Sequence, residues 1–157
     1  MIRVMAICLF RQSDEILVTE GLDTTNNQRY ARPLGGGVEL GETSEQTIVR
    51  EIREELGAEI RELKLLGVLE NLFELEGQLR HEVVFVYDGQ FADQSLYELA
   101  EIKLLDGEWR TGAIWRPLEW FGDECMLVPV GIEKLLHLPD APAREIRAAP
   151  PAFGAGL

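Results

Sequence analysis

Cysteine is scarce in this sequence: among 157 residues, Cys8 and Cys125 are the only two. Two cysteines cannot build a disulfide framework, so we expect reduced thiols and a cytoplasmic location. Cys8 stands within an apolar run, which predicts a buried packing role. Long apolar runs are also missing, because no stretch approaches the roughly 20 residues that a membrane-spanning helix requires. The run at residues 4–10 is too short for a signal peptide and is followed by charged residues. With no membrane-spanning run either, we expect no membrane partner.

Basic residues are in short supply. The chain has 15 Lys and Arg against 28 Asp and Glu, which gives a formal net charge of −13. A surface of this charge repels nucleic-acid duplexes and anionic membranes. It also repels a free nucleotide, so an anionic substrate would need a local device, either a bound metal or a few arginines.

Internal repeats are absent, and the length is enough for one domain with a sizeable core. We expect this domain at residues 1–138, followed by an Ala- and Pro-rich tail at residues 139–157. Apolar runs predict a hairpin from residues 2–10 and 16–19, one long or two short strands at 60–73, a central strand at 79–87 and a strand at 111–121 that Pro117 ends. Residues 21–32 are predicted to be an irregular loop, residues 96–105 a short strand or helical turn, and residues 128–138 a second amphipathic helix with Pro129 in its first turn.

The chain is organised around residues 36–58, which include the clearest helix signal. Thr43 and Gln46 have the spacing of a capping box, and Gly57 stands where a helix can end on a left-handed residue. Between these ends, one face is apolar and is expected to pack on the core. Its members are Ile48, Val49, Ile52 and Leu56.

Three glutamates occupy another face of this predicted helix. Glu51, Glu54 and Glu55 stand at i, i+3 and i+4, so their carboxylates lie close together and border the apolar stripe. Like charges at this spacing repel each other and require a neutralising partner. A hard cation such as Mg²⁺ supplies one, because it prefers carboxylate, carbonyl, water and phosphate oxygens.

The whole stretch resembles the Nudix box, whose pattern is G-x5-E-x7-R-E-U-x-E-E-x-G-U with U apolar. Gly36, Glu42 and the run from Arg50 to Gly57 match every fixed position, while Ala58 replaces a larger aliphatic residue. The resemblance implies an α+β Nudix fold, in which a mixed β-sheet is sandwiched between helices as an α/β/α sandwich. It also implies hydrolysis of a diphosphate linkage in a nucleoside diphosphate derivative by metal-activated water, with Mg²⁺ as cofactor and Mn²⁺ as a substitute.

The resemblance also implies residue roles. The metal ligands are Glu51, Glu54, Glu55 and the backbone carbonyl of Gly35, although Leu34 stands where many relatives have proline. Arg50, at i, i+4 from Glu54, would hold a carboxylate in place, and Glu42 would brace the glycine loop or the helix start. One of the helix glutamates, Glu82 or a later loop residue would be the base for water. The later candidates are Glu98, Glu101 and Glu108.

Substrate contacts are expected just before the box. Arg29, Tyr30 and Arg32 offer guanidinium donors and an aromatic ring. The expected partner is a small nucleotide or another diphosphate compound, and no substrate-class tag stands near the box, which favours nucleoside triphosphates or similar compounds. The sequence leaves open whether the chain forms a homodimer.

Two other classes stay open as well. One is an isoprenoid-diphosphate isomerase, a reaction that some Nudix-fold enzymes perform with an additional cysteine and glutamate; here Cys8 stands in a strand pattern and no other cysteine is near the box. The other is a non-catalytic Nudix-fold nucleotide-binding module, which usually loses the box carboxylates that this chain keeps.

Overall fold

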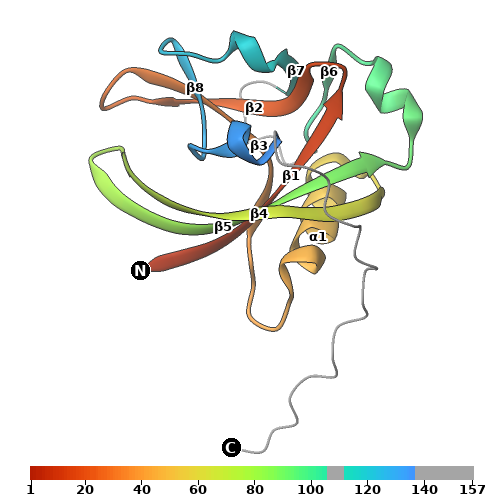
Figure 1. Ribbon diagram of the computed structural model, residues 1–157, viewed down its shortest axis with the longest axis horizontal. Helices are drawn as coiled ribbons and strands as arrows, with labels where there is room; N and C mark the ends of the chain where they lie inside the picture. Colours follow the sequence, from red (N-terminus) through yellow and green to blue (C-terminus); the bar gives the residue numbers. More distant parts are fainter. Residues whose placement is uncertain (106–111, 137–157) are drawn as a thin grey trace, which may run out of the picture.

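The computed structural model describes residues 1–105 and 112–136. In these ranges the chain forms a mixed sheet of eight strands, two α-helices and two 3-10 helices (Figure 1). The elements are β1 (Ile2–Gln12), β2 (Glu15–Asp23), β3 (Gln28–Gly37), α1 (Ser44–Leu56), β4 (Ile60–Leu75), β5 (Gln78–Phe91), η1 (Gln94–Glu98), β6 (Glu101–Ile102), β7 (Ala113–Pro117), η2 (Leu118–Trp120), β8 (Cys125–Leu127) and α2 (Ile132–Leu136). The predicted tail lies outside the described residues.

The strand order is β4-β5-β1-β3-β2-β7-β6, with β8 beside β3. Pairs β1–β5 and β3–β8 are parallel and the other pairs are antiparallel. Strand β3 joins the two halves of the sheet, because residues 34–37 pair with β1 and residues 28–33 pair with β2. Figure 1 shows the β2–β3 and β4–β5 hairpins extending to the same side of the molecule.

Alternation along β1 separates two cores. Ala6, Cys8 and Phe10 lie in one core with Ile48 and Ile52 of α1. The intervening β1 side chains lie in the other core with Ile132 of α2; they are Met5, Ile7 and Leu9. Successive side chains of a strand point to opposite faces, so the two helices cover opposite faces of the sheet. The sandwich expected from the sequence is therefore confirmed, although α2 has only five residues.

Helix α1 forms as its local signals predict. Thr43 is the N-cap, and both hydrogen bonds of the capping box with Gln46 are present. Gly57 has φ of 66°, and its N–H donates to the carbonyl of Arg53. Ile48 and Ile52 are completely buried, and Val49 and Leu56 are half-buried. No helix in the described ranges is long and apolar enough to cross a membrane.

Two predictions were wrong. Residues 21–32 form the outer halves of β2 and β3 and not an irregular loop, because Gly21 pairs with Tyr30 and Asp23 with Gln28, leaving only residues 24–27 as the turn. The second helix begins at Ile132 and not at residue 128. Val128 continues a ladder by donating its N–H to the carbonyl of Ala31, and Gly131 has φ of 106°, which lies outside the helical region.

Candidate active site

Arg50 is the hub of a charged network at the start of α1. Its Nη2 donates to Glu42 at 2.7 Å and to the carbonyl of Gly37 at 3.0 Å, and its Nη1 donates to Glu51 at 2.8 Å and to Glu54 at 3.3 Å. The hydrogen bonds that Arg50 donates to Glu42, together with the one to Glu51, raise the pKa of the guanidinium. One arginine thus holds three carboxylates and the glycine strand in fixed positions relative to α1.

Glu42 braces this hub. Besides two bonds from Arg50, its carboxylate accepts from the Glu39 N–H at 2.9 Å and from the Thr47 hydroxyl at 2.8 Å. Because these donors stabilise the charged form, with Arg50 the largest cause, the pKa of Glu42 falls from 4.5 to about 2. The described contacts of Glu42 are all with the loop and the helix start, as its predicted bracing role requires.

The Glu51 carboxylate packs directly on the backbone of the glycine strand. A Cβ atom at Gly36 would collide with that carboxylate, so a larger residue there would displace the Glu51 side chain from its present position. On the neighbouring residue, a Cβ atom at Gly37 would lie 3.6 Å from Nη2 of Arg3. Gly36 and Gly37 therefore separate the helix carboxylates from the residues at the start of β1.

Regular strand alternation predicts that the carbonyl of Gly35 points away from β1. Val38 donates its N–H to the carbonyl of Val4, and the register makes Gly36 opposite Ala6 the next hydrogen-bonded pair. In an antiparallel ladder such pairs alternate with pairs whose polar groups point outward, and Gly35 and Gly37 belong to the outward set. The outward carbonyl of Gly37 indeed accepts from Arg50. The Gly35 carbonyl is thus on the same edge as the Arg50 hub.

The three helix glutamates have different surroundings. Glu51 is mostly buried, Glu54 has 59% of its side chain exposed, and Glu55 is half-buried with its backbone carbonyl accepting from Leu105 at 2.8 Å. In residues 1–105 and 112–136, no three His, Cys, Asp or Glu side chains converge as a metal-binding group. The donor set is nevertheless all oxygen, with carboxylates beside an outward carbonyl, and this chemistry suits Mg²⁺ or Mn²⁺.

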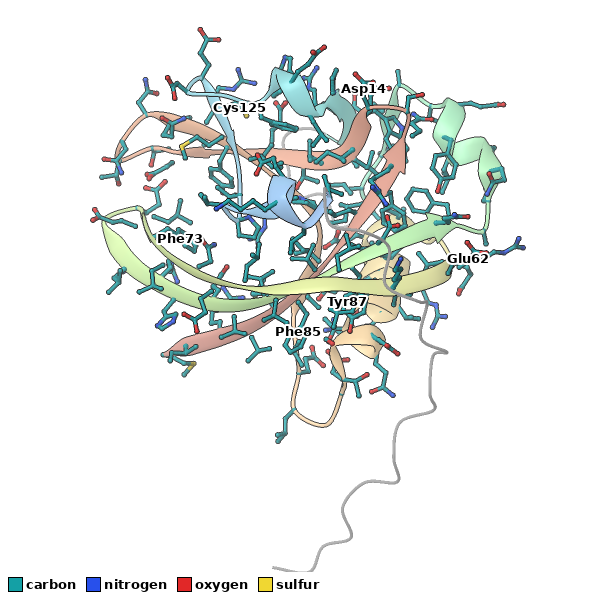
Figure 2. All side chains as sticks on the ribbon, in the orientation of Figure 1. Asp14, Glu62, Phe73, Phe85, Tyr87 and Cys125 are labelled. Atoms are coloured by element: carbon teal, nitrogen blue, oxygen red, sulfur yellow. The ribbon has the colours of Figure 1, made fainter. Side chains whose placement is uncertain are left out.

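A cavity of about 630 Å³ lies between the outer halves of the two hairpins. Its floor is built by alternation on β1, β4 and β5. Arg3, Glu82 and Asn71 are neighbours across three strands, and Arg80 pairs with Phe73 in the next row. Figure 2 shows Phe73 on the side that faces the β2–β3 hairpin, whereas Phe85 and Tyr87 lie on the α1 side.

The far end of the cavity is closed by contacts between the hairpin tips. Glu76, in the β4–β5 turn, accepts from the Thr24 N–H at 2.7 Å and from the hydroxyls of Thr24 and Thr25 at 2.6 and 3.1 Å. Asp23 accepts the Glu76 N–H at 3.4 Å. These bonds hold the β2–β3 tip against the β4–β5 tip.

The predicted substrate residues separate into two groups. Tyr30 and Arg32 line the cavity, together with Met126 and residues 128–130. Arg29 is not among the lining residues and donates to Glu20 at 3.0 Å, because strand alternation turns it to the other face of β3 from Tyr30.

Glu82 lies apart from the helix carboxylates. Its side chain is only 4% exposed, with one oxygen 3.9 Å from Nη1 of Arg3. It shares the strand face of Val84 and Val86, which pack in the α2 core, so it belongs to the cavity.

The later glutamates are not gathered at the hub either. Glu98 is exposed, Glu101 accepts the Gly112 N–H at 2.6 Å, and Glu108 lies outside the described residues. Residues that the sequence reasoning missed are Arg3, Asn71, Phe73 and Arg80. Alternation within residues 60–73 could have placed Asn71 and Phe73 on one face, and alternation within residues 79–87 could have assigned Arg80 to a face. Only the strand register shows that these faces are the same.

Comparison with known proteins now identifies the family. The model of the NUDIX domain matches residues 1–125. This chain belongs to the NUDIX family. A putative mutator protein MutT4 of Mycobacterium tuberculosis (strain CDC 1551 / Oshkosh) is 32% identical in an alignment of 105 residues that covers 55% of this chain and 42% of that protein. The chain therefore spans less than half the length of this curated relative.

Solved structures share the NUDIX fold. A MutT NUDIX hydrolase from Burkholderia pseudomallei has a TM-score of 0.65 and 21% identity, covering 88% of this chain and 99% of that one. A NUDIX hydrolase from Nitrosomonas europaea has a TM-score of 0.53 and 20% identity, covering 76% and 74%.

Proposed function

We propose that this NUDIX protein hydrolyses a diphosphate linkage in a nucleoside triphosphate or a similar nucleoside diphosphate derivative, using Mg²⁺ or Mn²⁺. The observation that supports this most is the arrangement around Arg50. One guanidinium contacts Glu51, Glu54 and the carbonyl of Gly37, Glu55 stands on the same helix, and the hairpins enclose a cavity large enough for a nucleoside.

Glu51, Glu54, Glu55 and the Gly35 carbonyl would hold the metal. When bound, the metal would neutralise phosphate charge and lower the pKa of a water molecule. Arg50 orients Glu51 and Glu54 and keeps the glycine strand against α1. A helix glutamate is the proposed base, and Glu55 is the first residue to test. Tyr30, Arg32 and the Arg3–Glu82 row would position the rest of the substrate in the cavity.

Isomerase chemistry is less well supported. Cys8 is completely buried, and burial raises the pKa of its thiol well above the ordinary value, which suits an inert packing residue. Cys125 is buried too. The cavity and the complete set of box carboxylates support hydrolysis over a non-catalytic module.

The test is a phosphate-release screen over nucleoside triphosphates and nucleoside diphosphate derivatives, with Mg²⁺ and with Mn²⁺. Wild-type protein should release product only with metal, and Glu55→Gln should lose turnover by at least about 100-fold. Glu45→Gln, the same change on the first turn of the same helix, is the matched control and should keep turnover. Full activity in EDTA, or equal turnover in both variants, would contradict the proposal.

A further inference from the structure

Two arginines of the cavity have no partner among the described residues. The guanidinium groups of Arg32 and Arg80 take part in no hydrogen bond or ion pair within residues 1–105 and 112–136, and the Nε atom of Arg80 is buried. Several other arginines of the described residues are paired: Arg11 with Asp88, Arg29 and Arg116 with Glu20, and Arg53 with Glu59. Carboxylates are plentiful, so two unpaired guanidinium groups at one cavity require an explanation.

The acidic residues around the cavity do not supply the missing partners. The carboxylate of Asp23 is used inside its own hairpin turn, where it accepts from Thr25 and Asn26. Glu70 and Glu74 line the cavity, but they pair with Val83 and Leu79, whose side chains alternate to the face opposite Arg80.

Glu82 faces the cavity and has Arg3 as its charged neighbour at 3.9 Å. The charges of Arg3 and Glu82 offset each other, so Arg32 and Arg80 are the positive charges of the cavity that no carboxylate of the described residues contacts. An unpaired buried N–H of a guanidinium is costly unless an acceptor meets it.

We propose that the cavity recognises a second anionic group of the substrate, a phosphate monoester on the moiety that the diphosphate links, through Arg32 and Arg80. This inference rests on the proposed function, since it concerns the substrate of the same site. A phosphate monoester carries up to two negative charges and three acceptor oxygens. Arginine matches such a group with parallel N–H donors.

The register separates this anion from the reacting diphosphate. Gly36, against the Glu51 carboxylate, is level with Ala6, and Glu82 is level with Arg3, three residues along β1. Arg80 lies two residues further along β5, so its backbone stands about 17 Å from the level of Gly36 at about 3.3 Å per residue, and its long side chain spans part of that distance. The group that meets Arg80 is therefore distinct from the diphosphate at the helix carboxylates.

Matched substrates test this directly. One pair is ADP-ribose 2′-phosphate against ADP-ribose, and another is coenzyme A against 3′-dephospho-coenzyme A. At least one phosphorylated member should have a kcat/KM at least about tenfold higher than its partner, because one charge-assisted contact accounts for a factor of this size. In Arg80→Met, and in Arg32→Met as a second variant, that ratio should fall toward one. Arg61→Met, an exposed arginine on β4 outside the cavity, is the control and should keep the wild-type ratio.

A stability measurement separates this role from a structural one. Arg80→Met without ligand should melt at or above the wild-type temperature, because it removes an unpaired buried donor. Suppose that the wild-type protein hydrolyses both members of both pairs but that the ratio of kcat/KM, phosphorylated over unphosphorylated, is one or less. This result would overturn the inference and leave the proposed function intact.

If no diphosphate is hydrolysed, the proposed function fails, and binding in EDTA then decides the inference. Adenosine 2′,5′-bisphosphate or adenosine 3′,5′-bisphosphate should bind at least about tenfold tighter than AMP, and only with Arg80 present. Equal affinities would overturn it.

Discussion

Replacement of Glu42 by glutamine tests whether the Arg50 hub stabilises the fold as well as the candidate active site. The wild-type carboxylate is 16% exposed and accepts four hydrogen bonds, two of them from Arg50. Glutamine keeps the size but removes the charge and turns an NH₂ group toward donors. Charge-assisted hydrogen bonds contribute about 1.5–3 kcal/mol against about 1 kcal/mol for neutral ones. We expect the free energy of unfolding at pH 7 to fall by about 2 kcal/mol.

The pH dependence provides an independent measure of the same interaction. The pKa of Glu42 is about 2 in the folded protein against 4.5 ordinarily. A lowered folded-state pKa stabilises the fold above the unfolded-state value, and this stabilisation is lost as the pH falls from about 4.5 toward 2. At 1.36 kcal/mol per pH unit, reduced for solvent screening, the loss is about 2 kcal/mol. Glu42→Gln has no such group, so its stability should decline less over this interval.

The assay is urea unfolding of both proteins at pH 7, 5, 4 and 3, with melting curves as a check. A change of about 2 kcal/mol lowers the melting temperature of a domain of this size by about 4–8 °C. The difference between the proteins should be largest at pH 7 and should shrink at pH 3. Equal stability at pH 7, or a difference that stays constant down to pH 3, would refute the reasoning that Glu42 is held as a charged acceptor.

Three further predictions concern the site. Glu55→Gln should lower kcat at saturating Mg²⁺ by at least about 100-fold while the melting temperature stays near wild type, since the cap and apolar stripe of α1 are unchanged; a much lower melting temperature with normal kcat would mean a structural role. Tyr30→Ala should raise KM more than it lowers kcat, and Arg29→Ala should have a smaller effect on KM because Arg29 bonds to Glu20 outside the cavity; the reverse order would contradict the cavity assignment. Glu76→Ala removes three hydrogen bonds between the hairpin tips, so KM should rise with little change in melting temperature, and an unchanged KM would show that the tips need no such link.

Local signals were enough to predict α1 and its charged face. The cap residues, the glycine end and the apolar spacing all concern residues within one helix, so each is readable from short sequence separations. The role of Glu42 as a brace and the contact of Arg50 with Glu54 also follow from this short range.

The cavity could not be predicted in this way, because its residues come from strands far apart in the chain. Residues 21–32 contain few continuous apolar residues, which favoured a loop, yet pairing of β2 with β3 and of β3 with β8 makes them strands. Tertiary pairing thus overrode local propensity. The same pairing sends Arg29 and Tyr30 to opposite faces, a distinction that a loop assignment does not contain.

Charge distribution links the two parts of the site. With a formal net charge of −13, the molecule as a whole repels any nucleotide, and long-range attraction cannot bring the substrate in. The protein must then select its substrate through short-range contacts. These act within the roughly 10 Å beyond which salt screens the interaction of exposed charges. Under the proposed function, bound metal would supply positive charge beside the helix carboxylates, which already neutralise Arg50, and Arg80 supplies positive charge in the cavity. A compound that reaches both places with anionic groups gains two local contacts, whereas a shorter anion gains one against the same repulsion.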